Sequence, residues 1–332
     1  MYIRFFLILM CTLVLAACVR IETKTEQNTF QSTMAALEVQ SHSQIGLSAV
    51  NMETGKKLEW RADERFKMAS TVKLPIAVSV LHLIETHKLT LDKMIRIEPY
   101  ELVPGSGKMG YFLTKPGLEL SIYNLLEPMI AISDNTASDI LLAEVGGPQA
   151  VRQYLYNNGL TDIWIDRTIL QLFLDSSGLT YIPSQKQRSL QDWKKRFDAV
   201  PDEVELRIAE RLHGDTRDTT TPKAMTALLS QIQEHKILQP REAELLLEIM
   251  SHTENKSPRI GKLLPKEAKL MHKTGSWWGA VHNYANDVGI IVTPKGEHIA
   301  ISVYTASEGG SSLEMQAQAI AEVANITYNA LS

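Results

Sequence analysis

Alternating apolar and polar positions at both ends of the chain predict β-strands. Residues 44–50 place apolar side chains at every second position, which is typical of a strand with one buried face. The turn signal Glu53-Thr-Gly55 follows, and a second extended run ends at Trp60, so the two runs predict a hairpin. Three further strands are predicted near the C-terminus, at residues 269–273, 286–292 and 298–305.

Helical periodicity accompanies these strands and fills the middle of the chain. One helix is predicted at residues 30–39, before the first strand, and an amphipathic helix begins at Ser311. In the first of the central helices Pro75 lies in the first turn, where its missing N–H matters least. The central helices are predicted at residues 71–87, 122–132, 136–145 and 149–157.

This order of elements indicates an α+β protein. The strands at the two ends form one antiparallel sheet flanked by helices, and the middle of the chain is an all-helical domain inserted into it. We therefore expect a sheet domain made of residues 29–68 and 222–332, and a helical domain made of residues 69–221. The chain has 332 residues, of which 44% are hydrophobic and 22% charged. This is an ordinary globular composition, and the length is enough for one large domain or two closely packed ones.

The charge and the metal-binding residue types exclude several classes of function. The formal net charge of -4 and the absence of a Lys/Arg run argue against nucleic-acid binding. The nine histidines show no His-x-x-x-His or Cys-His spacing, so we expect no metal and no other cofactor. We expect a monomer whose partner is a small molecule.

The first residues predict export and a lipid anchor. A basic start at Met1-Tyr-Ile-Arg4 precedes an apolar run at residues 5–15 that is too short to span a bilayer as a stable helix. Leu15-Ala-Ala-Cys18 resembles a bacterial lipoprotein processing site, so we expect residues 1–18 to be the lipoprotein signal, with Cys18 lipidated, and residues 19–28 to be a tether. An ordinary secretory signal with an incidental cysteine is the alternative.

This interpretation also predicts the compartment. The other cysteine, Cys11, lies inside the apolar run and is removed with it, so no disulfide forms. We expect the protein in the bacterial periplasm, anchored by lipid to a membrane. Val19 and Arg20 provide no acidic retention signal, which favours the outer membrane.

Three short polar motifs occur in a fixed order: Ser70-Thr-Val-Lys73, Ser133-Asp-Asn135 and Lys273-Thr-Gly275. Each is weak alone, because short strings arise by chance in a chain of this length. A solvated helix face, a turn and a strand end would account for them one by one. Together, in this order and in fitting predicted elements, they indicate one acyl-transfer site.

A serine hydroxyl becomes a nucleophile only when a neighbouring base removes its proton. Lys73 follows Ser70 by three residues, so the two side chains share one helix face. A lysine acts as a base when burial or another cation lowers its pKa, and Lys273 is the candidate for that cation. We expect the backbone N–H groups of Ser70 and Ser276 to form an oxyanion hole, with Gly275 leaving room for the substrate.

The three motifs together resemble the class A β-lactamase superfamily. The stretch Gly214-Asp-Thr-Arg-Asp-Thr-Thr-Thr-Pro222 is similar to the family's hinge between helical and sheet domains. The resemblance implies a β-lactamase/transpeptidase-like fold. It also implies that Ser70 is the acylated nucleophile, that Lys73 is its base and that Ser133 passes a proton to the leaving nitrogen. By the same resemblance, Asn135 contacts the substrate's side-chain amide, and Lys273 and Thr274 hold the substrate's carboxylate.

The chain departs from this family in the omega loop. Class A enzymes carry an Arg-Thr-Glu sequence there, whose glutamate activates the deacylating water. The corresponding sequence here is Asp166-Arg-Thr-Ile169. Phe173 occupies the position at which the family has an asparagine that helps to hold the deacylating water. Isoleucine cannot accept a proton, so we expect intact acylation and a slow or non-standard deacylation. A general base typically contributes about 100- to 10,000-fold.

Other groups near the loop are candidates for the missing base. Asp166 and Asp175 are nearby carboxylates, and Gln171 is able to position a water. Salt bridges from the two carboxylates to Arg167, which stabilise the loop, are the favoured interpretation. Lys73 is able to serve both steps, as in some other serine acyl-enzymes.

An enlarged segment, residues 176–213, separates the omega loop from the hinge and contains a helical stretch at 203–212. It is either an added pair of surface helices or a lid that reshapes the substrate pocket. Related environmental serine hydrolases of the superfamily also look like this, with Gly105-Ser-Gly107 upstream of Pro116-Gly117.

The sequence thus predicts a serine hydrolase that opens β-lactams or related amides and esters through an acyl intermediate on Ser70. Two alternatives stay open: a penicillin-binding or sensor protein that is acylated without turnover, and an esterase.

His272 should face away from Lys273 because side chains alternate along a strand. One of Trp277 and Trp278 is expected to wall the pocket and the other to pack outside it.

Overall fold

The computed structural model describes residues 27–179, 190–253, 258–279, 281–307 and 309–332. Its centre is a five-stranded antiparallel sheet with the strand order β2-β1-β9-β8-β7. The strands come from both ends of the chain, as the alternating patterns predict. Their bounds are β1 (Ser43–Asn51), β2 (Lys57–Trp60), β7 (Lys269–Trp278), β8 (Asn283–Val292) and β9 (His298–Ser307).

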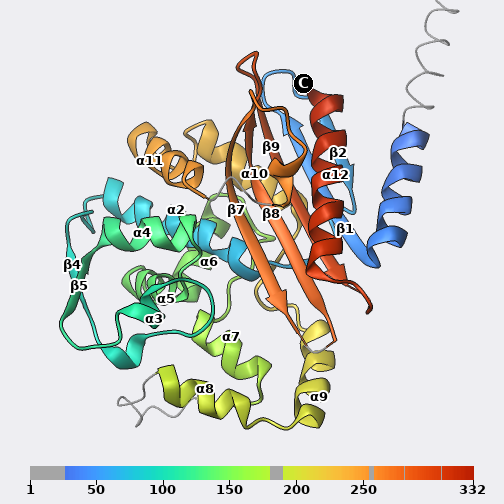
Figure 1. Ribbon diagram of the computed structural model, residues 1–332. Coiled ribbons are helices and arrows are strands. Elements are labelled where there is room, and N and C mark those ends of the chain that lie inside the picture. The colour runs from blue at the N-terminus through green and yellow to red at the C-terminus, as the bar shows by residue number, and fades with distance from the viewer. Residues whose placement is uncertain (1–26, 180–189, 254–257, 280, 308) are drawn as a thin grey trace, which may run out of the picture.

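Each face of this sheet is covered by helices (Figure 1). The helix at residues 27–41 and α12 (Leu313–Leu331) lie on one face, and α10 (Pro222–Gln233) lies on the other. The alternation of the strands supplies both cores: in β8, Ile291 packs towards α12, whereas Val288 joins the core on the side of α10. The sheet is therefore buried on both sides, as an α+β protein requires.

Most of the remaining helices lie beside the sheet, and those of residues 169–213 lie below it in the view of Figure 1. At their centre lies α2, in which all nine residues from Lys73 to Leu81 are buried, so the helix has no solvent-facing stripe. Short strand pairs complete this region: β3 (Phe66–Lys67) with β6 (Thr219–Thr220), and β4 (Met94–Ile97) with β5 (Leu118–Ser121). The helices are α2 (Lys73–Glu85), α3 (Met109–Phe112), α4 (Ile122–Ala131), α5 (Asn135–Glu144), α6 (Pro148–Asn157), α7 (Ile169–Ser176), α8 (Leu190–Asp198), α9 (Asp202–His213) and α11 (Pro240–Ser251), with 3-10 turns η1 (Ala69–Val72), η2 (Pro99–Glu101) and η3 (Ile260–Lys262).

The structure confirms the predicted hairpin, the three C-terminal strands and the helices around them, with strands β7 and β8 longer than predicted. It adds α10 and α11, which the hydrophobic pattern did not single out. Both begin with a proline at the first helical position, and the Thr221 hydroxyl accepts a hydrogen bond from the backbone N–H of Ala224 to cap α10. Within the described part of the chain, no helix has the length and apolar character needed to cross a membrane.

Candidate active site

Ser70 lies on the short 3-10 turn η1, which joins β3 to the buried helix α2. The turn is held from inside: the Thr71 hydroxyl donates to the Met68 carbonyl over 2.8 Å and lies 3.2 Å from the buried Tyr304 hydroxyl. Ala69 has a φ of +46°, a left-handed conformation that costs a residue with a Cβ about 1–3 kcal/mol. The fold thus holds the turn that presents Ser70 at the start of α2.

Lys73, one turn further, is completely buried and has three acceptors. Its Nζ lies within hydrogen-bond distance of the Ser133 carbonyl (2.6 Å), the Ser133 hydroxyl (3.1 Å) and Asn135 Oδ1 (2.7 Å). Ser133 turns both of its oxygens towards Lys73 in a left-handed backbone conformation, with a φ of +59°. Burial, and then the positive charge of Lys273, hold the pKa of Lys73 well below its ordinary value. The two predicted lysines therefore act on one another across the site.

The loop that precedes α3 fixes the Ser133-Asp-Asn135 segment. Asp134 caps α5 with one carboxylate oxygen and accepts the N–H groups of Lys108 and Met109 with the other, over 2.8 and 2.9 Å. A Cβ on Gly107 would stand 2.2 Å from that second oxygen, so this position has to be glycine. Asn135 donates from its amide to the Pro104 carbonyl over 2.8 Å. The segment Gly105-Ser-Gly107 thus acts by positioning the second motif.

Strand β7 approaches the Ser70 turn very closely. A Cβ on Gly275 would lie 2.7 Å from the Met68 carbonyl oxygen and 3.1 Å from the Ser70 nitrogen. Only glycine lets the strand come this near without displacing backbone. The contact brings Ser276 on β7 beside the Ser70 turn, which is the arrangement needed for the predicted pair of oxyanion donors.

Two buried cations lie on this strand side of the site. Lys273 is almost completely buried, and its ammonium donates to the Thr274 carbonyl over 2.8 Å. Burial and the nearby Arg259 lower the pKa of Lys273 to about 7, although Asp287 opposes them. Arg259 donates to the Gly275 carbonyl over 3.0 Å and also to the Ser276 hydroxyl. No motif pointed to Arg259, because it lies outside the three motifs in a segment with no predicted element.

His272, by contrast, takes no part in the site. It is completely buried, and its Nδ1 lies 2.8 Å from Asp287 Oδ1 on the neighbouring strand. Adjacent residues of a strand point to opposite faces, so His272 faces away from Lys273, as predicted.

The residue predicted to stand in place of the family's glutamate is an apolar one at the start of α7. Ile169 is the first residue of α7, is 8% exposed, and lines the cavity beside the Ser70 turn. A carboxylate does occur behind this corner: Asp139 on α5 accepts the N–H groups of Ile169 and Leu170 over 2.6 and 2.9 Å. Burial raises the pKa of Asp139 to about 6. The three motifs did not point to Asp139, which lies one turn after Asn135.

The other loop carboxylates form ion pairs. Asp175 pairs with Arg167 over 3.1 Å and accepts the Gln171 amide over 2.7 Å, as the favoured interpretation predicts. Asp166 pairs with Arg152 over 2.5 Å, so the expectation of a pair with Arg167 is wrong for this residue. Arg167 instead reaches Asp218 from the hinge, because the hinge strand β6 folds back beside the loop.

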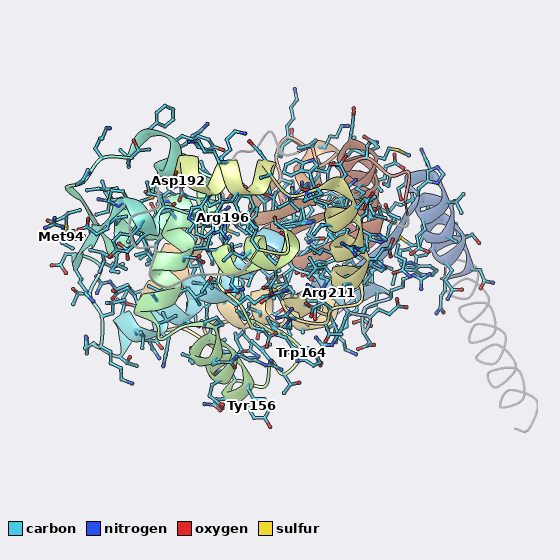
Figure 2. All side chains as sticks on the ribbon, turned by 90° about the horizontal axis from the view of Figure 1, so that it is seen from below. Met94, Tyr156, Trp164, Asp192, Arg196 and Arg211 are labelled. Carbon is cyan, nitrogen blue, oxygen red and sulfur yellow. The ribbon has the colours of Figure 1, made fainter. Side chains whose placement is uncertain are left out.

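A cavity of about 670 Å³ opens beside the Ser70 turn. Ala69 and Ser276 line it, together with residues of α7, α8 and α9. Figure 2, seen from below, labels Asp192 and Arg196 on α8 and Arg211 on α9, the helices on the side that faces the viewer. Trp277 and Trp278 both line the cavity, so the expectation that only one of them does so is wrong.

No group of three or more His, Cys, Asp or Glu side chains suited to a metal ion occurs in the part of the chain that the structure describes. Cys18, the predicted lipid attachment site, lies outside the described residues.

Comparison with known proteins shows which proteins this chain is similar to. A family model described as the β-lactamase enzyme family matches residues 29–331. The β-lactamase VEB-1 of Pseudomonas aeruginosa is 28% identical over 294 residues, which cover 87% of this chain and 85% of that protein. A β-lactamase of Mycobacterium tuberculosis is 30% identical over 277 residues, covering 83% of this chain and 77% of its own length.

Solved structures agree with these relatives. A β-lactamase from Chitinophaga pinensis superposes with a TM-score of 0.73 at 25% identity, over 90% of this chain and 98% of that one. An ancestral class A β-lactamase superposes with a TM-score of 0.72 at 27% identity, over 90% of this chain and 99% of that one. The matched length includes the sheet, the central helices and all three motifs. The chain therefore belongs to the β-lactamase enzyme family, as a serine hydrolase of the class A β-lactamase superfamily.

Proposed function

We propose that the protein opens β-lactams, or amides and esters of similar shape, by transferring their acyl group to Ser70. Neutral Lys73 takes the proton of the Ser70 hydroxyl as Oγ attacks the carbonyl carbon, and charge on the carbonyl oxygen is stabilised by the N–H groups of Ser70 and Ser276. The carbonyl–nitrogen bond then breaks, and Ser133 passes a proton to the leaving nitrogen. Water later cleaves the ester on Ser70 and releases the acid.

One observation carries this proposal: Lys73 is a buried amine with a lowered pKa that contacts Ser133 directly. An uncharged amine is the form that accepts a proton from serine, and burial beside a second cation favours that form. The 3.1 Å contact with the Ser133 hydroxyl supports a path for the same proton to the leaving group. A structural lysine would instead be expected to keep its charge by pairing with a carboxylate.

We further propose that deacylation is slow. The support is Ile169, an apolar side chain at the position of the family's glutamate, and Phe173, which replaces a water-holding amide. The same observation favours a second candidate function, a sensor that is acylated by a β-lactam or a peptidoglycan-like ligand and keeps the adduct.

Intact-mass spectrometry after mixing with a chromogenic cephalosporin distinguishes the two. A transient adduct with continuing colour change supports the hydrolase, and a stable adduct at one equivalent supports the sensor. The Ser70→Ala variant is the control and should give no adduct. Absence of both an adduct and a colour change on the unchanged protein refutes both functions.

We propose a periplasmic location with a lipid anchor at Cys18, supported by the Leu15-Ala-Ala-Cys18 sequence. A Cys18→Ser variant should move from the membrane fraction to the soluble periplasmic fraction. If the unchanged protein is itself soluble after fractionation, the anchor is wrong.

A further inference from the structure

The carboxylate of Asp287 is buried beneath the strand that carries the third motif. Asp287 belongs to β8 and is paired with Thr274 of β7 in the register of the sheet, next to the pair formed by Lys273 and Val288. Its side chain has no exposed surface. None of the steps of acyl transfer to Ser70 uses this carboxylate, so its burial beside the site needs an explanation of its own.

Asp287 lies on the face of the sheet that packs against α12. Ala285 and Ile291 share this face of β8 with it, because side chains alternate along a strand, and both belong to the core under α12. Lys273 points to the opposite face, where its partner Val288 joins the core beside α10. An ionised carboxylate among apolar side chains is costly unless positive charge lies near it. Since Asp287 and Lys273 are both buried, the sheet separates their charges and water does not screen them.

Two uncharged donors hold the carboxylate of Asp287 in place. His272 Nδ1 lies 2.8 Å from one of its oxygens, and the backbone N–H of Ile260 donates to the other over 3.2 Å. His272 is completely buried as well, and its Nε2 has no hydrogen-bond partner among the described residues. A protonated imidazole presents two donors, so a buried ring with a single acceptor favours the neutral form. His272 therefore orients the carboxylate without cancelling its charge.

The guanidinium of Arg259 supplies one positive charge near this carboxylate. It is buried and donates over 2.8 Å to the carbonyl of Asn286, the residue before Asp287. The N–H that Asp287 accepts belongs to Ile260, the residue after Arg259. Asp287 thus also has a structural role, because it fixes the segment that brings Arg259 to β7 and β8.

The ammonium of Lys273 supplies another positive charge. Titratable groups from several elements face it: Lys73 from α2, Arg259 from the segment before η3, and Asp287 from β8. Burial and Arg259 lower the pKa of Lys273 to about 7, and the negative charge of Asp287 opposes them. If that negative charge were removed, Lys273 would lose its proton at a lower pH.

We propose that Asp287 is a positioning residue for the substrate: it is a counter-ion on the far face of the sheet that keeps Lys273 charged at neutral pH. The proposal rests on acyl transfer to Ser70 and on the role of Lys273 in holding the substrate's carboxylate. It adds the residue that controls the charge of that carboxylate site. A purely structural role of Asp287 would change the acylation rate without changing its dependence on pH, so the pH profile separates the two roles.

The test compares two probes, benzylpenicillin and its methyl ester, which differ only in the carboxylate that Lys273 holds. The measured quantity is the second-order rate constant of acylation from pH 5 to pH 9. It is taken from adduct formation by intact mass or, if the adduct does not accumulate, from loss of the β-lactam. The readout is the ratio of the benzylpenicillin rate to the ester rate, which removes effects common to both probes. On the unchanged protein this ratio should fall as the pH rises through about 7.

Two neutral variants and one suppressor test the role of the charge. Asp287→Asn and Asp287→Thr differ in size but both remove the charge, so both should move the fall in the ratio to lower pH by about 1 unit. At pH 7 that shift lowers the ratio about 5-fold. In the Lys273→Arg protein the charge at residue 273 no longer titrates, so adding Asp287→Asn should leave the ratio independent of pH up to pH 9. Reaction with the methyl ester reports in each sample that the protein is folded.

Failure of this proposal is distinguishable from failure of the proposed function. If the ratio falls at the same pH in the unchanged protein and in both neutral variants, Asp287 does not control the charge of Lys273. A ratio that is lowered equally at every pH, or loss of reaction with both probes in both variants, shows that Asp287 only holds the segment at Ile260, and overturns the proposal too. Absence of both an adduct and β-lactam loss on the unchanged protein shows instead that acyl transfer to Ser70 is wrong.

Discussion

Restoring a carboxylate at residue 169 should restore fast release of the acyl group. Ile169 is 8% exposed, lines the cavity and begins α7, so a glutamate there reaches the same wall. We expect Ile169→Glu to accelerate deacylation of Ser70 by about 100- to 10,000-fold, the usual contribution of a general base. That range corresponds to about 3–5 kcal/mol of activation free energy.

The surroundings of the new carboxylate set the pH at which it works. Asp139 accepts the N–H of residue 169 over 2.6 Å and has a pKa of about 6 because it is buried. Two neighbouring carboxylates repel one another when both are ionised, which raises the pKa of at least one. Burial at residue 169 and the charge of Asp139 both disfavour ionisation of the new carboxylate, so the acceleration in Ile169→Glu should begin at a higher pH than the ordinary pKa of a glutamate. Adding Asp139→Asn removes the repulsion and should shift the onset to lower pH.

The measurement is the decay of the benzylpenicillin adduct by intact mass from pH 5 to pH 8. Ile169→Gln is the matched control, because glutamine has the same shape as glutamate but cannot accept a proton at these pH values. Equal decay rates in the glutamate and glutamine variants would refute the assignment of residue 169 to the missing base.

Three further outcomes are expected. Because the pKa of Lys273 is about 7, this side chain loses its charge as the pH rises through 7, and acylation by carboxylate-bearing substrates should fall. Lys273→Arg keeps its charge and should move this fall beyond pH 9. Coincident pH profiles of the acylation rate in the two proteins would contradict this role of Lys273. Gly275→Ala should slow acylation about 100-fold, because the added Cβ pushes β7, with its oxyanion donor Ser276, away from the Ser70 nitrogen. An unchanged acylation rate would contradict the close approach of β7 to the Ser70 turn. Because burial raises the pKa of Asp139 to about 6, its ionised form opposes folding, so the free energy of unfolding of Asp139→Asn relative to the unchanged protein should rise between about pH 4 and pH 6 in urea titrations. A stability difference that is independent of pH would contradict the raised pKa.

Local patterns in the sequence predicted most of the fold. The alternation in β1 and the long apolar run of α2 each reflect burial of a continuous stretch of chain. Burial of this kind requires apolar residues at regular positions, which can be recognised in the sequence. The helices α10 and α11 were not predicted, although Thr221 and the prolines that start them are ordinary helix signals.

The chemical identities at the site were also available from the sequence, since Ser70, Lys73 and Lys273 occur in short motifs with fixed spacing. Their environment was not. The pKa of Lys73 depends on burial and on Lys273, which is 200 positions away in the chain, and Arg259 and Asp139 reach the site through contacts that no motif encodes. Aromatic rings in the lining of the cavity likewise come together from α7, α8 and β7. Sequence alone determined which groups are able to react, and tertiary structure decided their charge and the shape around them, because desolvation and packing depend on neighbours in space.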